Sequence, residues 1–391
     1  MSVRSLLPAP DPVAAAHGAR VAAAIRAAID AAGGSIGFDE FMRLALYAPG
    51  LGYYQAGAAR FGTGGDFTTA PELSPVFARC LARQIREWLD AIGPGARILE
   101  FGAGSGRLAQ DLLDELARSG GTAPGYDILE VSADLRARQR ERLAAGHAGV
   151  AWLDRLPAAP WDGVVIANEV LDAMPVVRLR RQGEAVEELR VGTDGAGFAW
   201  RTAPASAADR AGLEAIEVAL GTPVAQGQVV ELCPMFGPWL AALAAVVRRG
   251  AVLLVDYGGS RAESHHPGHR DGNLVCHYRH RMHADPLVLA GLQDLSCAVD
   301  FSAVADAACA AGFDLAGYAT QAHFLIGCGL DEVLGSLQEL PHGQALRLAS
   351  QARTLVLPGE MGERFKALVL TRGLPDRPWR GFSFADHRAR L

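Results

Sequence analysis

One stretch, Arg97 to Leu116, constrains the fold of this 391-residue chain more than any other. It opens with apolar residues that follow a Gly-Pro-Gly break, as a buried strand does. Gly102, Gly104 and Gly106 come next, and glycines allow both a tight turn and a close approach of the backbone to a ligand. Leucines then recur at helical spacing between Leu108 and Leu116. Strand, glycine turn and helix in this order predict the first unit of a nucleotide-binding α/β sheet, whose ligand lies at the carboxyl end of the strand.

The spacing of the glycines bears on the identity of the ligand. A dinucleotide-binding turn has the pattern G-x-G-x-x-G, whereas Arg107 stands here in the place of its third glycine. Glu100, just before the turn, opposes a pyrophosphate but suits a ligand with a positive end, such as S-adenosylmethionine. The second predicted strand, 126–131, carries Glu130 near its end, where a carboxylate can accept both ribose hydroxyls. These residues favour S-adenosylmethionine, and NAD and a purely structural glycine turn remain the alternatives.

Further polar residues follow the other predicted strands. Asn168 and Glu169 come directly after a strongly apolar segment, and Asp256 lies near the end of another. Because the carboxyl ends of parallel strands face one crevice, these side chains and the two strand-end glutamates are expected to meet there. Each acid alone has a second interpretation, as a cap that stabilises the N-terminus of the following helix. Taken together they predict a functional site.

Glu169 and Asp172 form a potential acceptor site. They are three residues apart, so on one helical turn they share a face. A pair of carboxylates suits a guanidinium, which presents its donors as a planar fork. The alternative is that both acids stabilise a helix N-terminus.

Composition excludes some classes of function. A net charge of −6 and a pI near 6.0 give no general nucleic-acid footprint. No apolar run approaches the length of a membrane span, and the first residues lack the apolar core of a signal peptide. The six cysteines include no C-x-x-C pair, so we expect reduced cysteines in a cytoplasmic protein.

Several histidines between His265 and His283 have H-x-x-H spacings. Zinc needs three or four convergent ligands, and here arginines are interspersed and no cysteine pair is present. We therefore expect no metal, and interpret this segment as a basic loop facing an acidic or polar partner.

The remaining segments differ in pattern. Helices are expected at 13–31 and 38–47, and a long aperiodic loop at 52–74 is expected to act as a structured lid. Short alternating segments across 176–203 predict an antiparallel insertion, and 259–300 is expected to be irregular.

Beyond these local patterns, the chain resembles the MidA-type methyltransferases, a family that includes the mitochondrial complex I assembly factor, which methylates an arginine of a complex I subunit. The matching motifs run in order through nearly the whole chain: GYY (52–54), FGTGGDFTTAPELS (61–74), ILEFGAGSGRLAQDLL (98–113), YDILEVSADLRARQ (126–139), ANEVLDAMPV (167–176), DYG (256–258), VDF (299–301), TQAHFL (320–325) and MGERFKAL (361–368). The resemblance implies that the glycine turn and Glu130 bind S-adenosylmethionine. It also implies that a loop with Asp66, Thr68, Pro71 and Glu72 covers this cofactor.

Together these features predict a class I methyltransferase fold: a Rossmann-like α/β sheet of seven strands in the order 3-2-1-4-5-7-6, with an N-terminal helical extension and an inserted α+β subdomain. The expected parts are the N-terminal helices and covering loop at 1–95, a core at 96–175, 228–258 and 312–391, and substrate-side insertions at 176–227 and 259–311.

The expected function is transfer of a methyl group from S-adenosylmethionine to an arginine of a protein, such as a complex I subunit. An assembly chaperone that binds the cofactor without turnover, and an NAD-binding oxidoreductase, are the alternatives. The expected partners are a protein substrate and, in a homodimer, a second copy of the chain. We expect no nucleic acid and no membrane insertion. The predicted catalytic residues are Asn168, Glu169 and Asp172. The predicted cofactor-binding residues are Glu100, Gly102, Ala103, Gly104, Gly106, Glu130, Val131, Asn168, Asp66, Thr68, Pro71 and Glu72.

Overall fold

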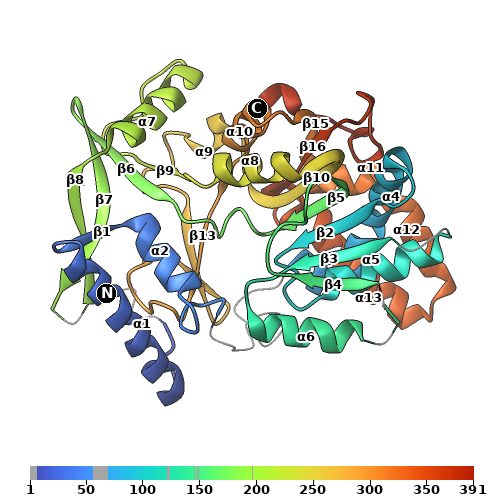
Figure 1. Ribbon diagram of the computed structural model, residues 1–391, viewed down its shortest axis with the longest axis horizontal. Helices are drawn as coiled ribbons and strands as arrows, with labels where there is room; N and C mark the ends of the chain where they lie inside the picture. The colour runs from blue at the N-terminus through green and yellow to red at the C-terminus, as the bar shows by residue number, and fades with distance from the viewer. Residues whose placement is uncertain (1–6, 56–68, 121–123, 145, 148, 196) are drawn as a thin grey trace. The chain divides into compact units, whose positions relative to one another are not determined.

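The computed structural model describes residues 7–55, 69–120, 124–144, 146–147, 149–195 and 197–391. The chain forms two compact units. The first comprises residues 1–67, 172–236 and 260–300, and the second comprises 68–171, 237–259 and 301–391. Figure 1 shows the elements of both units, each of which is considered by itself below.

The second unit is built on a mostly parallel sheet. Its strands lie in the order β4-β3-β2-β5-β10-β16-β15. The bounds are β2 Arg97–Phe101, β3 Gly125–Leu129, β4 Val150–Leu153, β5 Trp161–Asn168, β10 Val247–Gly259, β15 Asp314–Thr320 and β16 Phe365–Arg372. Numbered along the chain, these strands give the predicted order 3-2-1-4-5-7-6, and β16 runs antiparallel to both of its neighbours. The predicted methyltransferase-type sheet is therefore confirmed.

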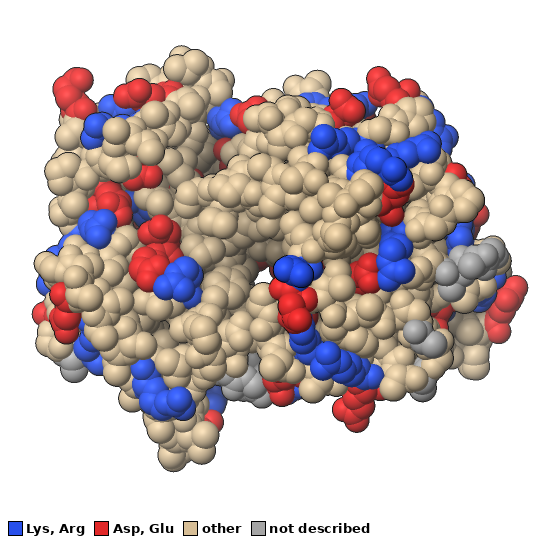
Figure 2. Space-filling model, in the orientation of Figure 1, with Lys and Arg blue, Asp and Glu red and all other residues tan. Residues whose placement is uncertain are grey.

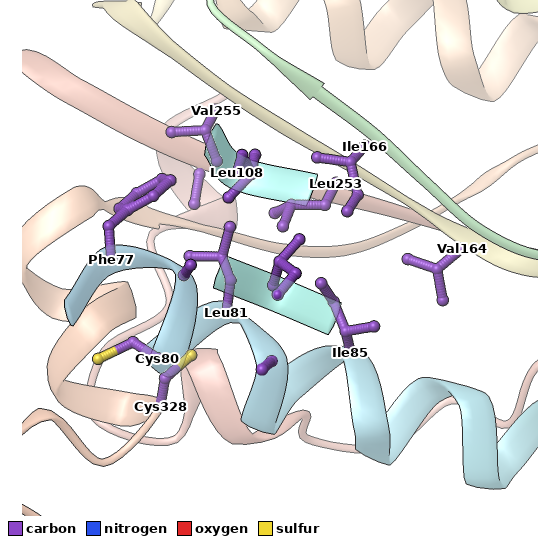
Figure 3. Packing of buried hydrophobic residues seen from close by; sticks show 14 of the residues in the cluster. Phe77, Cys80, Leu81, Ile85, Leu108, Val164, Ile166, Leu253, Val255 and Cys328 are labelled. Carbon is purple, nitrogen blue, oxygen red and sulfur yellow. The ribbon is translucent and has the colours of Figure 1, made fainter. Parts of the chain in front are cut away.

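Helices pack on this sheet, and α4 (Pro75–Ile92) shows why. The helix begins where the sequence predicts, because the Ser74 hydroxyl accepts a hydrogen bond from the Val76 amide and Pro75 fits the first turn. Its apolar face, with Leu81, contributes to a buried cluster that also includes Ile166 of β5 and Val255 of β10 (Figure 3). The helix therefore belongs to the core and not to the N-terminal part in which we placed it.

Further helices belong to this unit or begin at its edge. They are α3 Ala70–Leu73, α5 Arg107–Arg118, α6 Ala133–Leu143, α8 Phe236–Val246, α10 Phe301–Ala310, α11 Gln321–Gly327, α12 Leu330–Ser336, α13 His342–Val356 and α14 Met361–Arg364, with short 3-10 turns at Leu337–Glu339, Arg380–Phe382 and Arg388–Arg390. Among the described residues, none of the helices combines the length and the apolarity needed to cross a membrane.

The first unit joins the N-terminal helices to the predicted antiparallel insertion. Its larger sheet has the order β1-β7-β6-β9, with β8 also paired to β7. The elements are α1 Pro12–Ala31, β1 Ser35–Gly37, α2 Phe38–Tyr47, β6 Val177–Gln182, β7 Ala185–Asp194, β8 Gly197–Pro204, α7 Ala207–Leu220 and β9 Val229–Leu232. The assignment of residues 228–236 to the core is wrong, because β9 pairs antiparallel with β6. A shared apolar cluster, which includes Phe41 and Val176, unites the N-terminal helices and the insertion in one unit.

The segment 260–300 is more regular than we expected. After α9 (Arg261–Ser264) it forms a small antiparallel sheet in the order β12-β11-β13, with bounds β11 Leu274–Tyr278, β12 Arg281–His283 and β13 Asp294–Cys297, and β14 (Val299–Asp300) follows. Arg279 and His280 join β11 to β12, and both have positive φ angles, of 48° and 60°. Hairpin turns of this kind usually carry Asn or Gly, so the sequence lacks the usual signal of a hairpin here.

Candidate functional site

The glycine turn after β2 has the geometry that the sequence predicts. Gly102, Gly104 and Gly106 have φ angles of 60°, 54° and 81°, in the left-handed region that residues other than glycine rarely adopt. The Gly102 amide donates to the carbonyl of Leu129 over 3.0 Å, which ties the turn to the end of β3. A Cβ added to Gly104 would meet no described atom within 4 Å. The turn therefore presents its backbone, with open space in front of Gly104, as a close-fitting ligand requires.

Glu130 follows β3 directly and is held in one orientation. Its side chain accepts a hydrogen bond from the Ser132 amide over 3.0 Å and another from Gln139 Nε2 over 3.0 Å. Burial raises the pKa of this carboxyl, and the two hydrogen bonds oppose that shift. Val131, the next residue, is 59 % exposed although it is apolar. A fixed acid beside an exposed apolar side chain suits a nucleoside, with a ribose at the acid and a base at the apolar surface.

Glu100 is placed differently from what we expected of an acid that faces a positive ligand. It is buried, and its carboxyl accepts a hydrogen bond from the hydroxyl of Tyr126 over 2.9 Å. Burial raises the pKa of Glu100 to about 8, the Tyr126 hydrogen bond opposes this shift, and the charge of Glu130 adds to it. Its contact with a ligand stays a prediction.

Asn168 and Glu169 lie at the carboxyl end of β5. Asn168 Nδ2 donates to Glu169 Oε1 over 3.2 Å. The Asn168 Oδ1 atom is buried and has no hydrogen-bond partner within the described part of the chain. A Cβ added to Gly102 would lie 3.4 Å from a methyl carbon of Val170, so the Val170 side chain, just after β5, packs against the glycine turn. The structure therefore brings these two polar residues close to the turn.

One feature of the predicted acceptor pair is wrong. Glu169 has a φ angle of 55°, and residues 169–174 form bends and a turn with no helix. Glu169 and Asp172 therefore do not share the face of a helical turn. Asp172 also belongs to the first unit, where its carbonyl accepts a hydrogen bond from the Cys297 amide over 2.8 Å. A joint role for the two acids stays a prediction.

Asp256, expected as a member of the polar crevice, is fully buried and serves the backbone. Its Oδ2 atom accepts hydrogen bonds from the amides of Val170 and Leu171, over 3.1 and 2.9 Å, and its Oδ1 atom accepts one from Tyr257. The Glu169 amide in turn donates to the carbonyl of Val255 over 2.9 Å. These bonds from β10 hold the chain in the strained conformation that Glu169 adopts.

The loop predicted to cover the cofactor is described only at its end. Asp66 and Thr68 lie outside the described residues. Pro71 is buried in α3, and the hydroxyl of Ser105, in the glycine turn, donates a hydrogen bond to Glu72. Glu72 therefore contacts the predicted cofactor site.

Two of the histidines between His265 and His283 lie close to polar side chains. His265 Nε2 lies 3.3 Å from Asp300 Oδ2, and His269 Nδ1 lies 2.7 Å from Asn273 Oδ1. Within the described ranges, no group of three or more His, Cys, Asp or Glu residues is placed to hold a metal ion. Figure 2 shows basic and acidic side chains intermixed over the described residues of the face that it draws.

Gln139 is a residue of this site that the sequence alone did not single out. Its amide bonds to Glu130 and also to the carbonyl of Gly104, over 2.9 Å. It lies in α6 among arginines, at the end of the family motif 126–139, and the helical pattern around it is that of an ordinary exposed helix.

Comparisons with known proteins agree with this geometry. Residues 80–319, more than half of the chain, match the sequence profile of a family described as "Putative S-adenosyl-L-methionine-dependent methyltransferase". The chain belongs to this family, and it is an S-adenosylmethionine-dependent methyltransferase.

Two groups of similar proteins have more specific names than the family. The chain is 30 % identical to the mitochondrial protein arginine methyltransferase NDUFAF7 of Xenopus tropicalis, over 85 % of this chain and 81 % of the relative. It is 29 % identical to the Danio rerio protein of the same name, over 85 % and 82 %. A Burkholderia thailandensis protein, solved with S-adenosyl-homocysteine bound, is 42 % identical and has a TM-score of 0.92, with 98 % of this chain and 100 % of that chain covered.

The residues present fit the cofactor. The open backbone at Gly104 leaves room for a ligand, and Glu130 offers fixed carboxylate oxygens to ribose hydroxyls. The prediction of S-adenosylmethionine in preference to NAD is confirmed. The role of each individual residue stays a prediction.

Proposed function

We propose that this methyltransferase acts on an arginine side chain of a protein, such as a subunit of respiratory complex I. The observation that carries the proposal is the polar end of β5. There Asn168 and Glu169 lie beside the glycine turn, with a carboxylate and a buried amide oxygen as hydrogen-bond acceptors. A guanidinium carries only donors, so acceptors are what an arginine needs. The names of the mitochondrial relatives support the same choice.

S-adenosylmethionine supplies an electrophilic methyl carbon on a sulfonium, so the protein mainly has to bind, orient and exclude water. Glu130 would hold the ribose, and the backbone at Gly104 would lie against the ligand. Glu169 would pair with the guanidinium and draw its positive charge away from the nitrogen that attacks. Asn168, which already donates to Glu169, would keep this carboxylate in place and accept a further N–H at its Oδ1 atom.

Lysine and arginine differ in how their nitrogens become able to attack a methyl group. A lysine ammonium must lose a proton before its nitrogen can attack, and a carboxylate beside it would favour the charged form. Arginine carries one positive charge before and after transfer, because the attacking nitrogen loses one proton, to the Glu169 carboxylate or to water, as its bond to the methyl carbon forms and the S–CH3 bond breaks. A carboxylate also pairs well with the planar fork of the guanidinium. The polar end of β5 therefore suits arginine better.

The test is a methyl-transfer assay with isotope-labelled S-adenosylmethionine and complex I subunits from a cell extract as acceptors. Mass spectrometry should locate the label on arginine. Label on lysine would contradict the choice of acceptor. A protein that binds the cofactor but transfers no label to any subunit would favour the assembly chaperone.

The proposal includes a cytoplasmic location, and the support is the state of the cysteines. All six are described as free thiols, and burial raises the pKa of Cys80 and Cys233 to about 12, which makes them unreactive. Cysteines of this kind are typical of a reducing compartment.

A further inference from the structure

Gln139 is buried in α6 and makes three hydrogen bonds with groups of three different strand ends. Its Nε2 atom donates to the carbonyl of Gly104 over 2.9 Å and to Glu130 Oε2 over 3.0 Å. Its Oε1 atom accepts from the indole nitrogen of Trp152, in β4, over 2.9 Å. Both amide hydrogens and the amide oxygen are thereby used.

The bond to Trp152 fixes the orientation of the amide. An indole nitrogen is a donor only, so the amide oxygen of Gln139 must face it. The NH₂ group is then directed at Gly104 and Glu130, which both offer acceptors. A flipped amide would place two donors together and would leave the carboxylate facing an oxygen.

The glycine turn is shaped around the same side chain. A Cβ added to Gly106 would lie 3.4 Å from both Cα and Cγ of Gln139. Gly106 therefore allows α6 to approach the turn closely enough for the amide to reach the carbonyl of Gly104.

We propose that Gln139 is a positioning residue for cofactor binding, which sets the separation between the Glu130 carboxylate and the glycine turn. The inference rests on the proposed role of Glu130 toward ribose. The Gln139 amide bonds both to the Glu130 carboxylate and to the carbonyl of Gly104, so it links the two groups directly. The ribose and the part of the ligand that lies against the glycine turn are then bound at one fixed separation. Trp152 acts one step further away, because it holds the amide.

The test compares ligands that differ only in the ribose. The Kd values of S-adenosylhomocysteine and its 2′-deoxy counterpart are measured by calorimetry for the wild type, Gln139→Met, Glu130→Gln and Gln321→Met. Gln321 is the matched control, because it is equally buried and donates to the carbonyl of Leu355, in another part of the unit. Methionine keeps the length of the side chain and removes its hydrogen bonds.

We expect Gln139→Met to raise the Kd of S-adenosylhomocysteine about tenfold, which corresponds to about 1.4 kcal/mol of binding free energy. It should also bring the Kd values of the two ligands closer together. A misplaced Glu130 bonds less well to the 2′-hydroxyl, so loss of that hydroxyl costs less affinity. Gln321→Met should lower the melting temperature and leave both Kd values unchanged. A Gln139→Met protein with the wild-type ratio would overturn the inference.

Two variants, Glu130→Gln and Trp152→Phe, distinguish the possible outcomes. If Glu130→Gln retains the wild-type ratio, the ribose role of Glu130 is wrong; if only Gln139→Met retains it, the positioning role is wrong. Should Gln139→Met fail to fold, Trp152→Phe decides, because it removes only the N–H that orients the amide. A narrowed ratio in Trp152→Phe supports the inference, and an unchanged ratio contradicts it.

Discussion

Glu130 and Glu169 are both acids at the carboxyl ends of parallel strands, yet the structure holds them in opposite ways. The side chain of Glu130 is buried and fixed by two donors, from Ser132 and Gln139. At Glu169 the backbone is in a left-handed conformation, and the half-buried side chain takes a hydrogen bond from Asn168. A buried carboxylate that is oriented before the ligand arrives suits a cofactor whose structure does not vary. A half-buried carboxylate suits an acceptor that arrives on another protein.

The same sequence pattern, an acid at the end of a parallel strand, therefore gives two different local structures. The strained turn at Glu169 is held from β10, through the carboxylate of Asp256 and the carbonyl of Val255. Non-glycine residues with positive φ cost about 1–3 kcal/mol, and they persist where the surrounding structure fixes them. The predictions that follow separate the two acids, from the largest expected effect to the smallest.

Gly104→Val should abolish cofactor binding, and with it the functions of both acids. The valine side chain would occupy the open space in front of the turn, so we expect affinity to fall by more than about a thousandfold, or about 4 kcal/mol. Calorimetry with S-adenosylhomocysteine measures this.

The control for this variant is Gly120→Val. Gly120 also has a positive φ angle, 82°, and open space around it, but it follows the far end of α5. It should lose stability to a similar degree and keep its affinity. Equal loss of binding in both variants would mean that backbone strain, and not occupied space, is the cause.

Glu169→Gln should reduce kcat about 100-fold and leave donor affinity nearly unchanged, because only the acceptor loses its charged partner. Single-turnover transfer at saturating S-adenosylmethionine, with a separate titration of donor binding, measures the two effects. If donor binding is lost while transfer at saturation proceeds at full rate, Glu169 belongs to the cofactor site and the contrast with Glu130 disappears.

Glu130→Gln should give the reverse. Hydrogen bonds to charged groups contribute about 1.5–3 kcal/mol, so the Kd of the donor should rise about tenfold or more while kcat at saturation stays close to the wild-type value. Circular dichroism should show an intact fold. An unchanged Kd with a reduced kcat would exchange the roles that we assign to the two acids.

The sequence predicted the framework of this site well, because the framework is local. The strand Arg97–Phe101 and the helix Arg107–Arg118 agree to within two residues with the stretch from Arg97 to Leu116 that apolar periodicity and glycine spacing predict. The acids at the ends of β3 and β5 follow from the same periodicity, and the strand order follows from family resemblance.

The rest depends on contacts between distant parts of the chain. Leu171 and Asp256 are 85 residues apart, and their hydrogen bond is part of what makes the backbone after β5 turn where a helical turn was expected. The amide of Gln139 bonds to a carbonyl 35 residues away, and no single-sequence pattern reports a bond of that kind. The hairpin at Arg279 and His280 lacks the usual turn residues, which is why 260–300 looked irregular.

Substitution of Glu100 should have the smallest effect of these variants. Glu100 is a third kind of strand-end acid, because its carboxyl is predominantly neutral near pH 7. Burial raises its pKa from the ordinary 4.5 to about 8, with the charge of Glu130 adding to the shift. In the unfolded chain the carboxyl ionises near pH 4.5, whereas in the fold it keeps its proton until about pH 8. Its contribution to stability is therefore fully present below pH 4.5 and declines as the pH rises through this window. Urea unfolding at about pH 5 and about pH 8 should show a smaller decline for Glu100→Gln than for the wild type, because glutamine can still accept from Tyr126 and never ionises. The neighbouring charge of Glu130 contributes to the raised pKa of Glu100. Glu130→Gln should therefore reduce part of the loss of stability between about pH 5 and about pH 8. If the wild type and Glu100→Gln lose stability equally between the two pH values, Glu100 is ionised in the fold. It would then be a third carboxylate of the site, as the sequence first suggested.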